Sequence, residues 1–299
     1  MKQIDWPFSV GVIGLGIMGS SVARHLAADG RDVIGFDTDA ARRQTLAGRG
    51  IRMVDSAAAA AQADLLLTSL PSEQALETTV DAIVGASRPQ DQILIELSTL
   101  SLQGKTRQSK RLAAAGVTML DCPISGTGAQ AAEKDIVLLV SGDEAVARRC
   151  QPVFEDFSRS AIYLGAFGNG TRMKFVANLL VAIHNVAAAE AISLGIHCGL
   201  DPATLCDVLS AGAGTSRMLE VRGPMMVREV YEPPTMKLDV WQKDMGLIKE
   251  FARAVGVATP LFDATAPLYR AAVAAGHGQE DTAAVRIALE ALSSGLAND

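Results

Sequence analysis

The sequence has few cysteines and no excess of positive charge. The four cysteines are Cys122, Cys150, Cys198 and Cys206. They have neither the paired spacing of a zinc site nor the density of a disulfide-stabilised domain. We therefore expect reduced thiols and a cytoplasmic protein. Acids and bases are intermixed along the chain, and the formal net charge of −6 argues against nucleic acid or an anionic membrane as a main partner.

The sequence also lacks a long uninterrupted hydrophobic run. Residues 1–9 contain a single lysine and no apolar run, so they do not resemble a signal peptide. Within the most apolar stretch, residues 175–199, polar side chains occur at Asn178, His184, Asn185 and Glu190. The unbroken runs fall well short of the roughly 18 apolar residues that indicate a membrane span. We instead expect a long helix that is buried on most of its sides.

What the sequence does contain is a regular alternation of short apolar runs and amphipathic segments over its first half. The runs that we predict as buried strands are 10–14, 33–37, 65–70, 93–98, 119–121, 136–141 and 161–164. Amphipathic stretches such as 18–29 and 102–115 separate them and are predicted helices. This alternation predicts an α/β domain with a mostly parallel sheet covered by helices on both faces.

The pattern changes near Gly168. From Thr171 nearly to the end the sequence is helical, with predicted breaks near 199–202, 212–216, 232–234 and 256–260. With 299 residues, of which 49% are hydrophobic, the chain is long enough for two domains of ordinary size. We predict an α/β domain over residues 1–168 and an all-helical domain over residues 169–299.

A glycine-rich turn follows the first predicted strand and opens a helix, with the sequence Gly14-Leu15-Gly16-Ile17-Met18-Gly19. The first glycine permits a tight turn, the second lets the backbone approach a pyrophosphate, and the third lets the helix pack against the strand. Phosphates would lie at the helix N-terminus, where free amide groups and the helix dipole favour negative charge. Residues 1–168 are therefore predicted to be a Rossmann-like domain that binds a dinucleotide.

An acidic residue, Asp37, closes the second predicted strand, eighteen residues after Gly19. A carboxylate at this position can accept hydrogen bonds from the ribose hydroxyls and would repel a 2′-phosphate, so we expect NAD as the cofactor rather than NADP. The alternative is an ordinary exposed Asp at a strand end. Arg42 and Arg43 are the main argument for NADP, but we expect them to lie on a solvated helix face.

Four separated motifs resemble the β-hydroxyacid dehydrogenase family, which includes 3-hydroxyisobutyrate dehydrogenase, tartronate semialdehyde reductase and L-threonate dehydrogenase. Residues 14–19 fit its G-x-G-x-M-G motif, and residues 121–126 (DCPISG) fit its D-x-P-[VI]-S-G substrate loop. Residues 168–174 (GNGTRMK), with Asn178 following, fit its G-x-G-x-x-x-K segment. Lys243 and Asp244 fit a K-D pair near its C-terminus.

The resemblance implies roles for individual residues. Lys174 is the implied catalytic acid/base, and Asn178 helps to hold the substrate. Ser125 and Gly126, which we extend to Thr127, bind the substrate carboxylate. The implied cofactor contacts beyond the glycine loop are Leu70, Pro71, Thr99 and Lys243. The resemblance also implies a Rossmann-like domain followed by a helical domain that contributes to the substrate site and builds a homodimer or homotetramer.

The physical chemistry of Lys174 is consistent with the implied role. Oxidation of an alcohol by hydride transfer requires the hydroxyl proton to leave, and the reverse reaction requires a proton donor. Partial burial at the start of an apolar helix would bring the pKa of a lysine towards neutrality. Asn178 lies one turn further on, on the same helix face. We therefore predict NAD-linked interconversion of a small 3-hydroxy acid and its semialdehyde or 3-keto acid, with no metal. The alternative interpretation of Lys174 is a solvated lysine at the start of a helix.

Two positions depart from the family pattern, which usually has glycine where this chain has Thr127 and Lys134. Both positions are expected beside the substrate pocket. They therefore weaken any inference of a particular substrate from the family. Thr127 either contacts the substrate and favours polar or polyhydroxylated acids, or caps the following helix. Two other functions are considered, an imine reductase of the same architecture and a non-catalytic nucleotide-binding protein. Lys174 argues against both.

Overall fold

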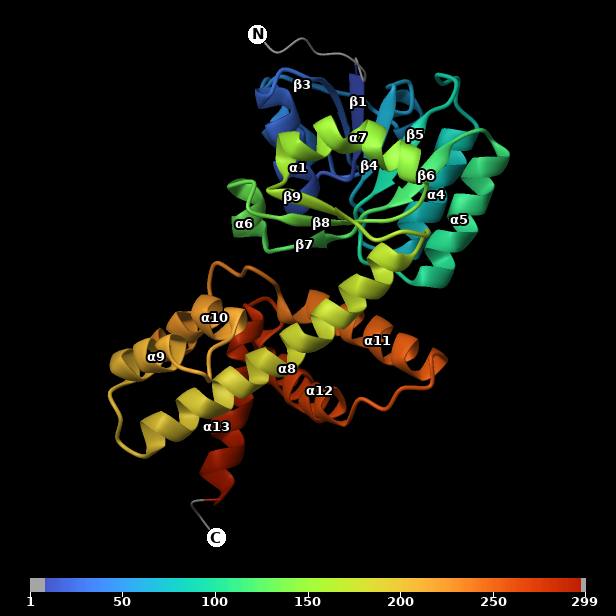
Figure 1. Ribbon diagram of the computed structural model, residues 1–299. Coiled ribbons are helices and arrows are strands. Elements are labelled where there is room, and N and C mark those ends of the chain that lie inside the picture. The colour runs from blue at the N-terminus through green and yellow to red at the C-terminus, as the bar shows by residue number, and fades with distance from the viewer. Residues whose placement is uncertain (1–8, 297–299) are drawn as a thin grey trace. The chain divides into compact units, whose positions relative to one another are not determined.

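A computed structural model describes residues 9–296 of the chain (Figure 1). Residues 1–8, to which the expectation about a signal peptide applies, lie outside the described residues. The chain divides into two compact units, Met1–Lys174 and Phe175–Asp299. The division falls inside a helix, shortly after the boundary predicted near Gly168.

The first unit contains a six-stranded sheet in which every paired neighbour is parallel. Its strands are β1 (Ser9–Ile13), β2 (Asp32–Phe36), β3 (Ile51–Met53), β4 (Leu65–Thr68), β5 (Ile93–Glu96) and β6 (Thr118–Asp121). The order β3-β2-β1-β4-β5-β6 is that of a Rossmann fold, in which the strand order reverses between β1 and β4 although all strands stay parallel. The predicted parallel α/β architecture is confirmed.

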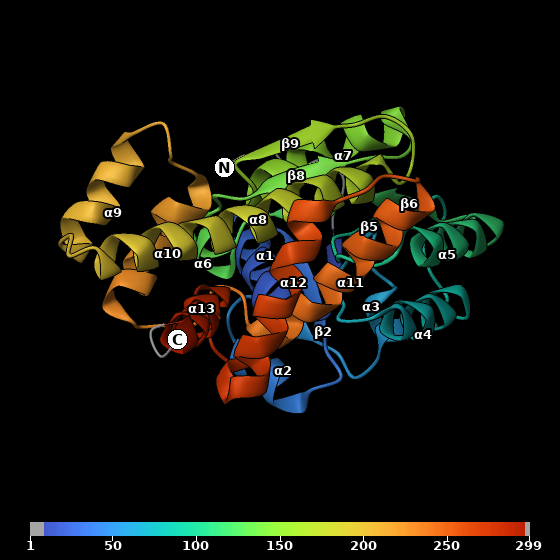
Figure 2. The same ribbon diagram turned by 90° about the horizontal axis from the view of Figure 1, so that it is seen from below.

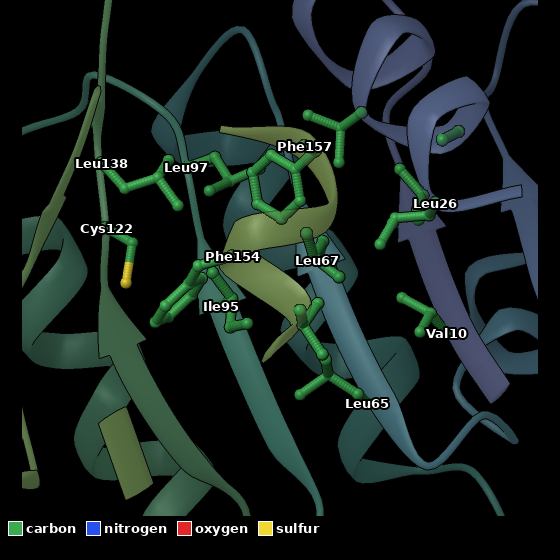
Figure 3. Close-up of a cluster of buried hydrophobic side chains, with 14 of the residues drawn as sticks. Val10, Leu26, Leu65, Leu67, Ile95, Leu97, Cys122, Leu138, Phe154 and Phe157 are labelled. Carbon is green, nitrogen blue, oxygen red and sulfur yellow. The ribbon is translucent and has the colours of Figure 1, made fainter. Parts of the chain in front are cut away.

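Helices cover both faces of this sheet (Figure 1). They are α1 (Ile17–Ala28), α2 (Ala40–Leu46), α3 (Ala57–Ala60), α4 (Glu73–Val84), α5 (Leu102–Ala114) and α7 (Glu144–Phe157). Side chains alternate along each strand, so β4 directs Leu65 and Leu67 to one core and Leu66 to the other. On the first face they pack against α1 and α7 through Leu26 and Phe154 (Figure 3). Helices α3, α4 and α5 cover the opposite face.

A second, three-stranded sheet follows, with β7 (Ile124–Ser125), β8 (Val137–Val140) and β9 (Ser160–Tyr163) in sequence order. Strand β7 is antiparallel to β8, and the short helix α6 (Gly128–Ala132) connects them. The prediction of a buried strand over 161–164 was wrong in one respect. Ile162 and Tyr163 are 48% and 41% exposed, because β9 is an edge strand that pairs only with β8.

The described part of the second unit is helical (Figure 2). Its helices are α8 (Asn169–His197, which begins in the first unit), α9 (Pro202–Ala211), α10 (Arg217–Arg228), α11 (Leu238–Ala254), α12 (Pro260–Ala272) and α13 (Val285–Leu296), with short helical turns η1 (Val273–His277) and η2 (Thr282–Ala284). The four predicted breaks all fall between these helices.

Helix α8 is the long apolar helix that the sequence predicts for residues 175–199. Its length of 29 residues and mean hydropathy of 1.7 would suffice to cross a membrane, and 44% of its most apolar window is buried. It contributes Phe175, Ala182 and Ile192 to the core of the second unit, whereas Leu180 and Leu194 are 47% and 71% exposed. The helix is thus covered on most of its sides, as predicted, and one apolar side lies outside the core.

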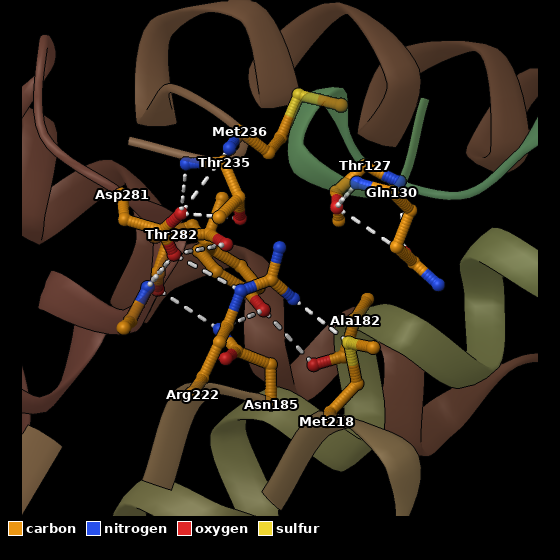
Figure 4. A network of polar contacts seen from close by, with 12 residues as sticks. Thr127, Gln130, Ala182, Asn185, Met218, Arg222, Thr235, Met236, Asp281 and Thr282 are labelled. Carbon is orange, nitrogen blue, oxygen red and sulfur yellow. Dashed lines mark hydrogen bonds and ion pairs between the residues drawn. The ribbon is translucent and has the colours of Figure 1, made fainter. Parts of the chain in front are cut away.

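A buried ion pair organises the second unit around Asp281 (Figure 4). Its carboxylate accepts hydrogen bonds from Arg222 Nε at 3.0 Å and from Thr235 N and Oγ1 at 2.7 and 2.6 Å. Burial alone would raise the pKa of Asp281, but the charge of Arg222 and the hydrogen bonds of Thr235 and Ala283 outweigh it, so the pKa is lowered. Asp281 therefore stays ionised and joins α10, the 229–237 segment and η2.

Replacing Asp281 by Asn should destabilise the protein by about 3–5 kcal/mol at neutral pH, because Arg222 loses its buried counter-charge. The lowered pKa means that this stabilisation is present above the unfolded-state value of about 4 and is lost as the pH falls through the folded-state value. Thermal unfolding of the wild type and Asp281→Asn should therefore converge in acid. Asp263→Asn, in an exposed pair with Lys249, is the control and should change stability by less than about 1 kcal/mol.

Candidate functional site

The glycine loop after β1 is held by contacts between backbone atoms. Gly14 has a φ of +90° and donates its N–H to Phe36 O at 2.8 Å. A Cβ atom at Gly14 would lie 2.2 Å from Ser69 O, and one at Gly19 would lie 1.9 Å from Gly14 O. Any side chain at either position would displace backbone, so these two glycines fix the start of α1 against the end of β4.

The remaining glycine of the loop leaves room for a ligand. A Cβ atom at Gly16 would have Arg42 Nη1, 3.8 Å away, as its nearest neighbour. Gly16 caps α1 without a side-chain hydrogen bond, and the first turn of α1 has no acidic residue, whereas Ser72 and Ser101 cap α4 and α5 with their hydroxyls. The first backbone N–H groups of α1 and its positive dipole end therefore suit the phosphates of a dinucleotide.

Asp37 follows β2 and is 5% exposed. Its Oδ2 accepts a hydrogen bond from Leu15 N at 2.7 Å, and its Oδ1 accepts one from Asp39 N at 2.9 Å. The carboxylate therefore ties the glycine loop to the segment that opens α2. Arg42 Nη1 also donates to Oδ2, at 3.4 Å, so Oδ1 is the oxygen with a lone pair left to accept a ribose hydroxyl.

Both arginines of α2 contact this segment; Arg42 is exposed, as predicted for a solvated helix face, whereas Arg43 is half-buried. Arg42 Nη1 lies 3.4 Å from Asp37 Oδ2, although the Arg42 side chain is 53% exposed. Arg43 donates to the carbonyl oxygens of Asp37 and Thr38, and its guanidinium lies 5.9 Å from the centre of the Phe36 ring. Because their partners are the acid and carbonyl groups that end β2, both side chains turn back towards the glycine loop.

The loops after β4 and β5 carry three more of the predicted cofactor residues. Leu70 is half-buried and donates its N–H to Ser98 Oγ at 2.7 Å, Pro71 is exposed, and Thr99 is half-buried. Strands β4, β1 and β5 are parallel, and β4 is paired with the other two, so their carboxyl ends meet at one edge of the sheet. The structure thus brings Leu70, Pro71 and Thr99 to the same edge as the glycine loop, where Rossmann folds bind their ligands.

The segment after β7 lies against the first turn of α1. Gly126 has a φ of +143°, and a Cβ atom there would lie 2.8 Å from Ile136 Cγ2. A Cβ atom at Gly128 would lie 2.5 Å from Ile17 Cγ2. Residues 125–128, which include the half-buried Ser125, are therefore held next to the predicted phosphate site.

Thr127 caps α6 (Figure 4). Its Oγ1 accepts a hydrogen bond from Gln130 N at 3.3 Å and lies 3.2 Å from Gln130 Oε1, which also accepts one from Thr127 N at 3.0 Å. This reciprocal pair is a capping box. Of the two interpretations of Thr127, the geometry favours the helix cap.

Lys134 lies at the other end of α6, away from Thr127. Its φ is +57°, the left-handed region in which glycine is favoured, and its Nζ lies 2.7 Å from Asp29 Oδ2 at the end of α1. The expectation that Lys134 lies beside the substrate loop was therefore wrong, because its side chain is directed to the C-terminal end of α1.

Lys174 and Asn178 lie on one face of α8, separated by one helical turn. They are 9% and 3% exposed, and Thr171 on the same face is 1% exposed. The first turn of this helix packs tightly on the first unit, because a Cβ atom at Gly170 would lie 2.2 Å from Leu139 O. Thr171 donates its N–H and hydroxyl to the carboxylate of Asp121 at 2.8 and 2.7 Å. The start of the helix that carries Lys174 is thereby anchored at the end of β6.

Asp244 fixes the orientation of Asn178. Asn178 Nδ2 donates to Asp244 Oδ2 at 3.1 Å, and Asp244 is 4% exposed. Lys243 Nζ lies 3.7 Å from Asp244 Oδ1. An ionised carboxylate can only accept hydrogen bonds, so the amide nitrogen must face Asp244 and Oδ1 is turned away from it. In the sequence Asp244 is recognisable only as part of the K-D pair, because its contact with Asn178 depends on how α8 and α11 pack.

Sequence reasoning also missed a buried charged cluster at the sheet edge. Lys105 on α5 lies 2.5 Å from Glu96 Oε2 and 2.8 Å from Asp121 Oδ1, and all three side chains are fully buried. Asp121 ends a predicted strand, whereas Glu96 lies inside the predicted strand 93–98 and ends the shorter β5 of the structure. The spacing from Leu102 and Leu112 places Lys105 on the buried face of α5, unlike the exposed Lys110, but that spacing alone does not show which acids it meets.

Comparisons with known proteins cover both units. Residues 9–165 match the family model described as the NAD binding domain of 6-phosphogluconate dehydrogenase. Residues 168–288 match the model described as NAD-binding of NADP-dependent 3-hydroxyisobutyrate dehydrogenase. The chain is 33% identical over 291 residues to glyoxylate/succinic semialdehyde reductase 2, chloroplastic, of Arabidopsis thaliana, covering 96% of this chain and 80% of that protein. It is also 33% identical to L-threonate dehydrogenase of Cupriavidus necator, covering 93% and 94%.

Solved structures give the same result. A 3-hydroxyisobutyrate dehydrogenase of Mycobacterium tuberculosis matches with a TM-score of 0.85 and 29% identity over 94% of this chain and 99% of that one. An imine reductase of Myxococcus stipitatus matches with a TM-score of 0.61 and 18% identity over 95% of this chain and 100% of that one, which shows a shared fold alone. With family matches along both units and full-length relatives at this identity, the chain belongs to the β-hydroxyacid dehydrogenase family of NAD(P)-binding oxidoreductases.

Proposed function

We propose that this enzyme interconverts a small 3-hydroxy acid and its semialdehyde or 3-keto acid, with NAD as the hydride carrier. The observation that carries the proposal is the pair Lys174 and Asn178, nearly buried and one turn apart on α8. The names of the relatives, which include an L-threonate dehydrogenase and a 3-hydroxyisobutyrate dehydrogenase, support this substrate class. We further propose a homodimer or homotetramer, supported by exposed apolar side chains of α8 such as Leu180 and Leu194.

Lys174 handles the proton in this proposal. A nicotinamide held by the enzyme would supply the hydride acceptor for oxidation of the hydroxyl-bearing carbon and the hydride donor for the reverse reaction. Lys174 Nζ takes the hydroxyl proton during oxidation and donates a proton to the carbonyl oxygen during reduction. Its position near the start of an apolar helix, at 9% exposure, limits competition by bulk water.

The other residues hold the substrate and the cofactor. Asn178, with its Nδ2 held by Asp244, orients the reacting hydroxyl. Ser125 and Gly126 bind the carboxylate. Thr127 was predicted with them, but its amide and hydroxyl are engaged with Gln130, so we assign it to holding the loop. The glycine loop 14–19 and Asp37 bind the pyrophosphate and the adenosine ribose, and Leu70, Pro71, Thr99 and Lys243 contact the rest of the cofactor.

Lys174→Ala should reduce turnover by about a hundredfold or more, which is the usual contribution of a positioned acid/base. Turnover is measured for a set of 3-hydroxy acids from the absorbance of the NADH that forms. The dissociation constant of NADH should stay nearly unchanged, because the phosphate site lies at residues 14–19. Lys249→Ala, which removes an exposed lysine of α11, is the control and should keep wild-type turnover. Near-normal turnover of Lys174→Ala would refute the mechanism, and a loss of NADH binding would indicate a structural role.

The cofactor preference should favour NAD over NADP by at least about tenfold in kcat/KM, on the order of 1.4 kcal/mol, because Asp37 repels a 2′-phosphate. Arg42 lies beside Asp37 and offsets part of this repulsion. Arg42→Ala should therefore lower kcat/KM with NADP more than with NAD. Equal efficiency of the wild type with both cofactors would show that Asp37 does not face the ribose, or that Arg42 or Arg43 compensates for it.

Thr127→Ala should destabilise the protein by about 1 kcal/mol through loss of the α6 cap while leaving the ranking of substrates unchanged. Thr127→Ser keeps the capping hydroxyl and should retain wild-type stability. Melting temperatures, measured together with kinetics on 3-hydroxyisobutyrate and on a polyhydroxylated acid such as threonate, test this expectation. A weaker preference for the polyhydroxylated acid in Thr127→Ala would instead show that the hydroxyl contacts substrate.

A further inference from the structure

The buried cluster of Lys105, Glu96 and Asp121 lies at the carboxyl edge of the parallel sheet. Glu96 ends β5 and Asp121 ends β6, and the two residues are paired in register. Lys105 reaches both carboxylates from α5, at 2.5 and 2.8 Å. One ammonium group therefore connects the ends of two neighbouring strands.

Such a cluster is an expensive way to stabilise a fold. Burying ionised groups costs several kcal/mol each, and well-packed hydrophobic residues of similar volume often stabilise as well or better. Burial also lowers the pKa of Lys105, but the charges and hydrogen bonds of Asp121 and Glu96 outweigh it and raise the pKa above its ordinary value. Lys105 is therefore a permanent cation whose position is set by two acids.

The first arm of the cluster leads to the loops that follow β4 and β5. Glu96 Oε1 accepts a hydrogen bond from Ser98 N at 2.9 Å. Ser98 Oγ in turn accepts one from Leu70 N at 2.7 Å. This arm thus holds the segments that contain Leu70 and Thr99, which our proposed function places along the cofactor.

The second arm leads to the first turn of α8. Besides accepting from Thr171 N and Oγ1, the carboxylate of Asp121 accepts from Ser141 Oγ at 3.2 Å. Ser141 Oγ accepts a hydrogen bond from Gly170 N at 2.9 Å. Two N–H groups at the start of α8 are thereby satisfied by this network, and Lys174 lies one turn after Thr171.

We propose that Lys105 is a positioning residue that holds the cofactor loops and the helix turn carrying Lys174 in one fixed frame through Glu96 and Asp121. This inference rests on the proposed function. Hydride and proton must leave the same alcohol, so the nicotinamide and Lys174 Nζ must be placed together. A misplacement of about 1 Å can cost about a hundredfold in rate, which is the reason to fix both with one rigid cluster.

The second arm is tested with Thr171→Val, because Lys105→Met would leave two buried carboxylates without a counter-charge and can prevent folding. Thr171→Val removes one hydrogen bond and keeps the shape of the side chain. We expect kcat to fall about tenfold, while KM for NAD and the dissociation constant of NADH stay within about twofold, because only the proton-handling group is displaced. Thr171→Ser restores the hydroxyl and should recover most of kcat.

Thr265→Val is the matched control. Thr265 is a buried threonine of α12 whose hydroxyl bonds only within its own helix, to Phe262 O at 2.8 Å. It should lose stability comparably to Thr171→Val but keep wild-type kcat. If Thr171→Val also keeps wild-type kcat, or if Thr171→Ser fails to recover it, the cluster has no positioning role towards Lys174.

The first arm is tested with Ser98→Ala, which removes the acceptor for Leu70 N. We expect the dissociation constant of NADH, measured by fluorescence titration, to rise about fivefold, in the range of one lost hydrogen bond of about 1 kcal/mol. Ser293→Ala, whose hydroxyl bonds only to Leu289 O, is the control and should leave NADH binding unchanged. An unchanged NADH affinity of Ser98→Ala would overturn this arm of the proposal.

A measurement that does not depend on turnover distinguishes a failure of this inference from a failure of the proposed function. The rate at which an amine-directed acylating reagent modifies Lys174, followed by peptide mass spectrometry, should rise severalfold in Thr171→Val and return in Thr171→Ser. The exposed Lys249 serves as the internal reference. A wild type that binds NADH but oxidises no 3-hydroxy acid would refute the proposed function, and the acylation rates would still test the positioning of Lys174. Equal rates in wild type and Thr171→Val would refute that positioning.

Discussion

The contact between Asp121 and the first turn of α8 determines where the helix that carries Lys174, the proposed acid/base, begins. A carboxylate that ends a buried strand accepts two hydrogen bonds from Thr171, so the helix must begin at the carboxyl edge of the sheet. The approach is so close that only glycine fits at position 170. Lys174 follows one turn later. The distance from its backbone to the end of β6 is therefore fixed by the geometry of the helix.

Glycines in two other motifs likewise lie where close packing leaves no room for a side chain. Gly14 and Gly19 bring the start of α1 against the end of β4, and Gly126 brings the substrate loop against Ile136. At each of these positions a Cβ atom would lie under 3 Å from another atom. The glycines of such motifs are usually explained by the space that a ligand needs. Here most of these glycines are required by packing within the protein. Gly16, with open space around it, is the glycine of the loop that is left for the ligand.

The sequence predicted the fold well because its strands are short apolar runs and its breaks contain glycine or proline. It missed β3 and β7, which have three and two residues and are too short to show a period. It predicted Lys174 from a motif but could not predict Lys105, since the burial of a lysine on an amphipathic helix depends on which acids the sheet places opposite it. The cap at Thr127 was recognisable, because Gln130 follows three residues later, as in a capping box.

The two departures from the family pattern have a common physical explanation. Thr127 begins α6 and Lys134 follows its end, and each replaces the conformational freedom of glycine with a specific contact, to Gln130 and to Asp29. Between them, Ala131 O accepts hydrogen bonds from Ser21 and His25 and so attaches α6 to α1. Both changes thus hold the short helix in place beside the glycine loop. Neither side chain therefore adds an unengaged polar group next to Ser125 and Gly126, the residues that we propose for carboxylate binding.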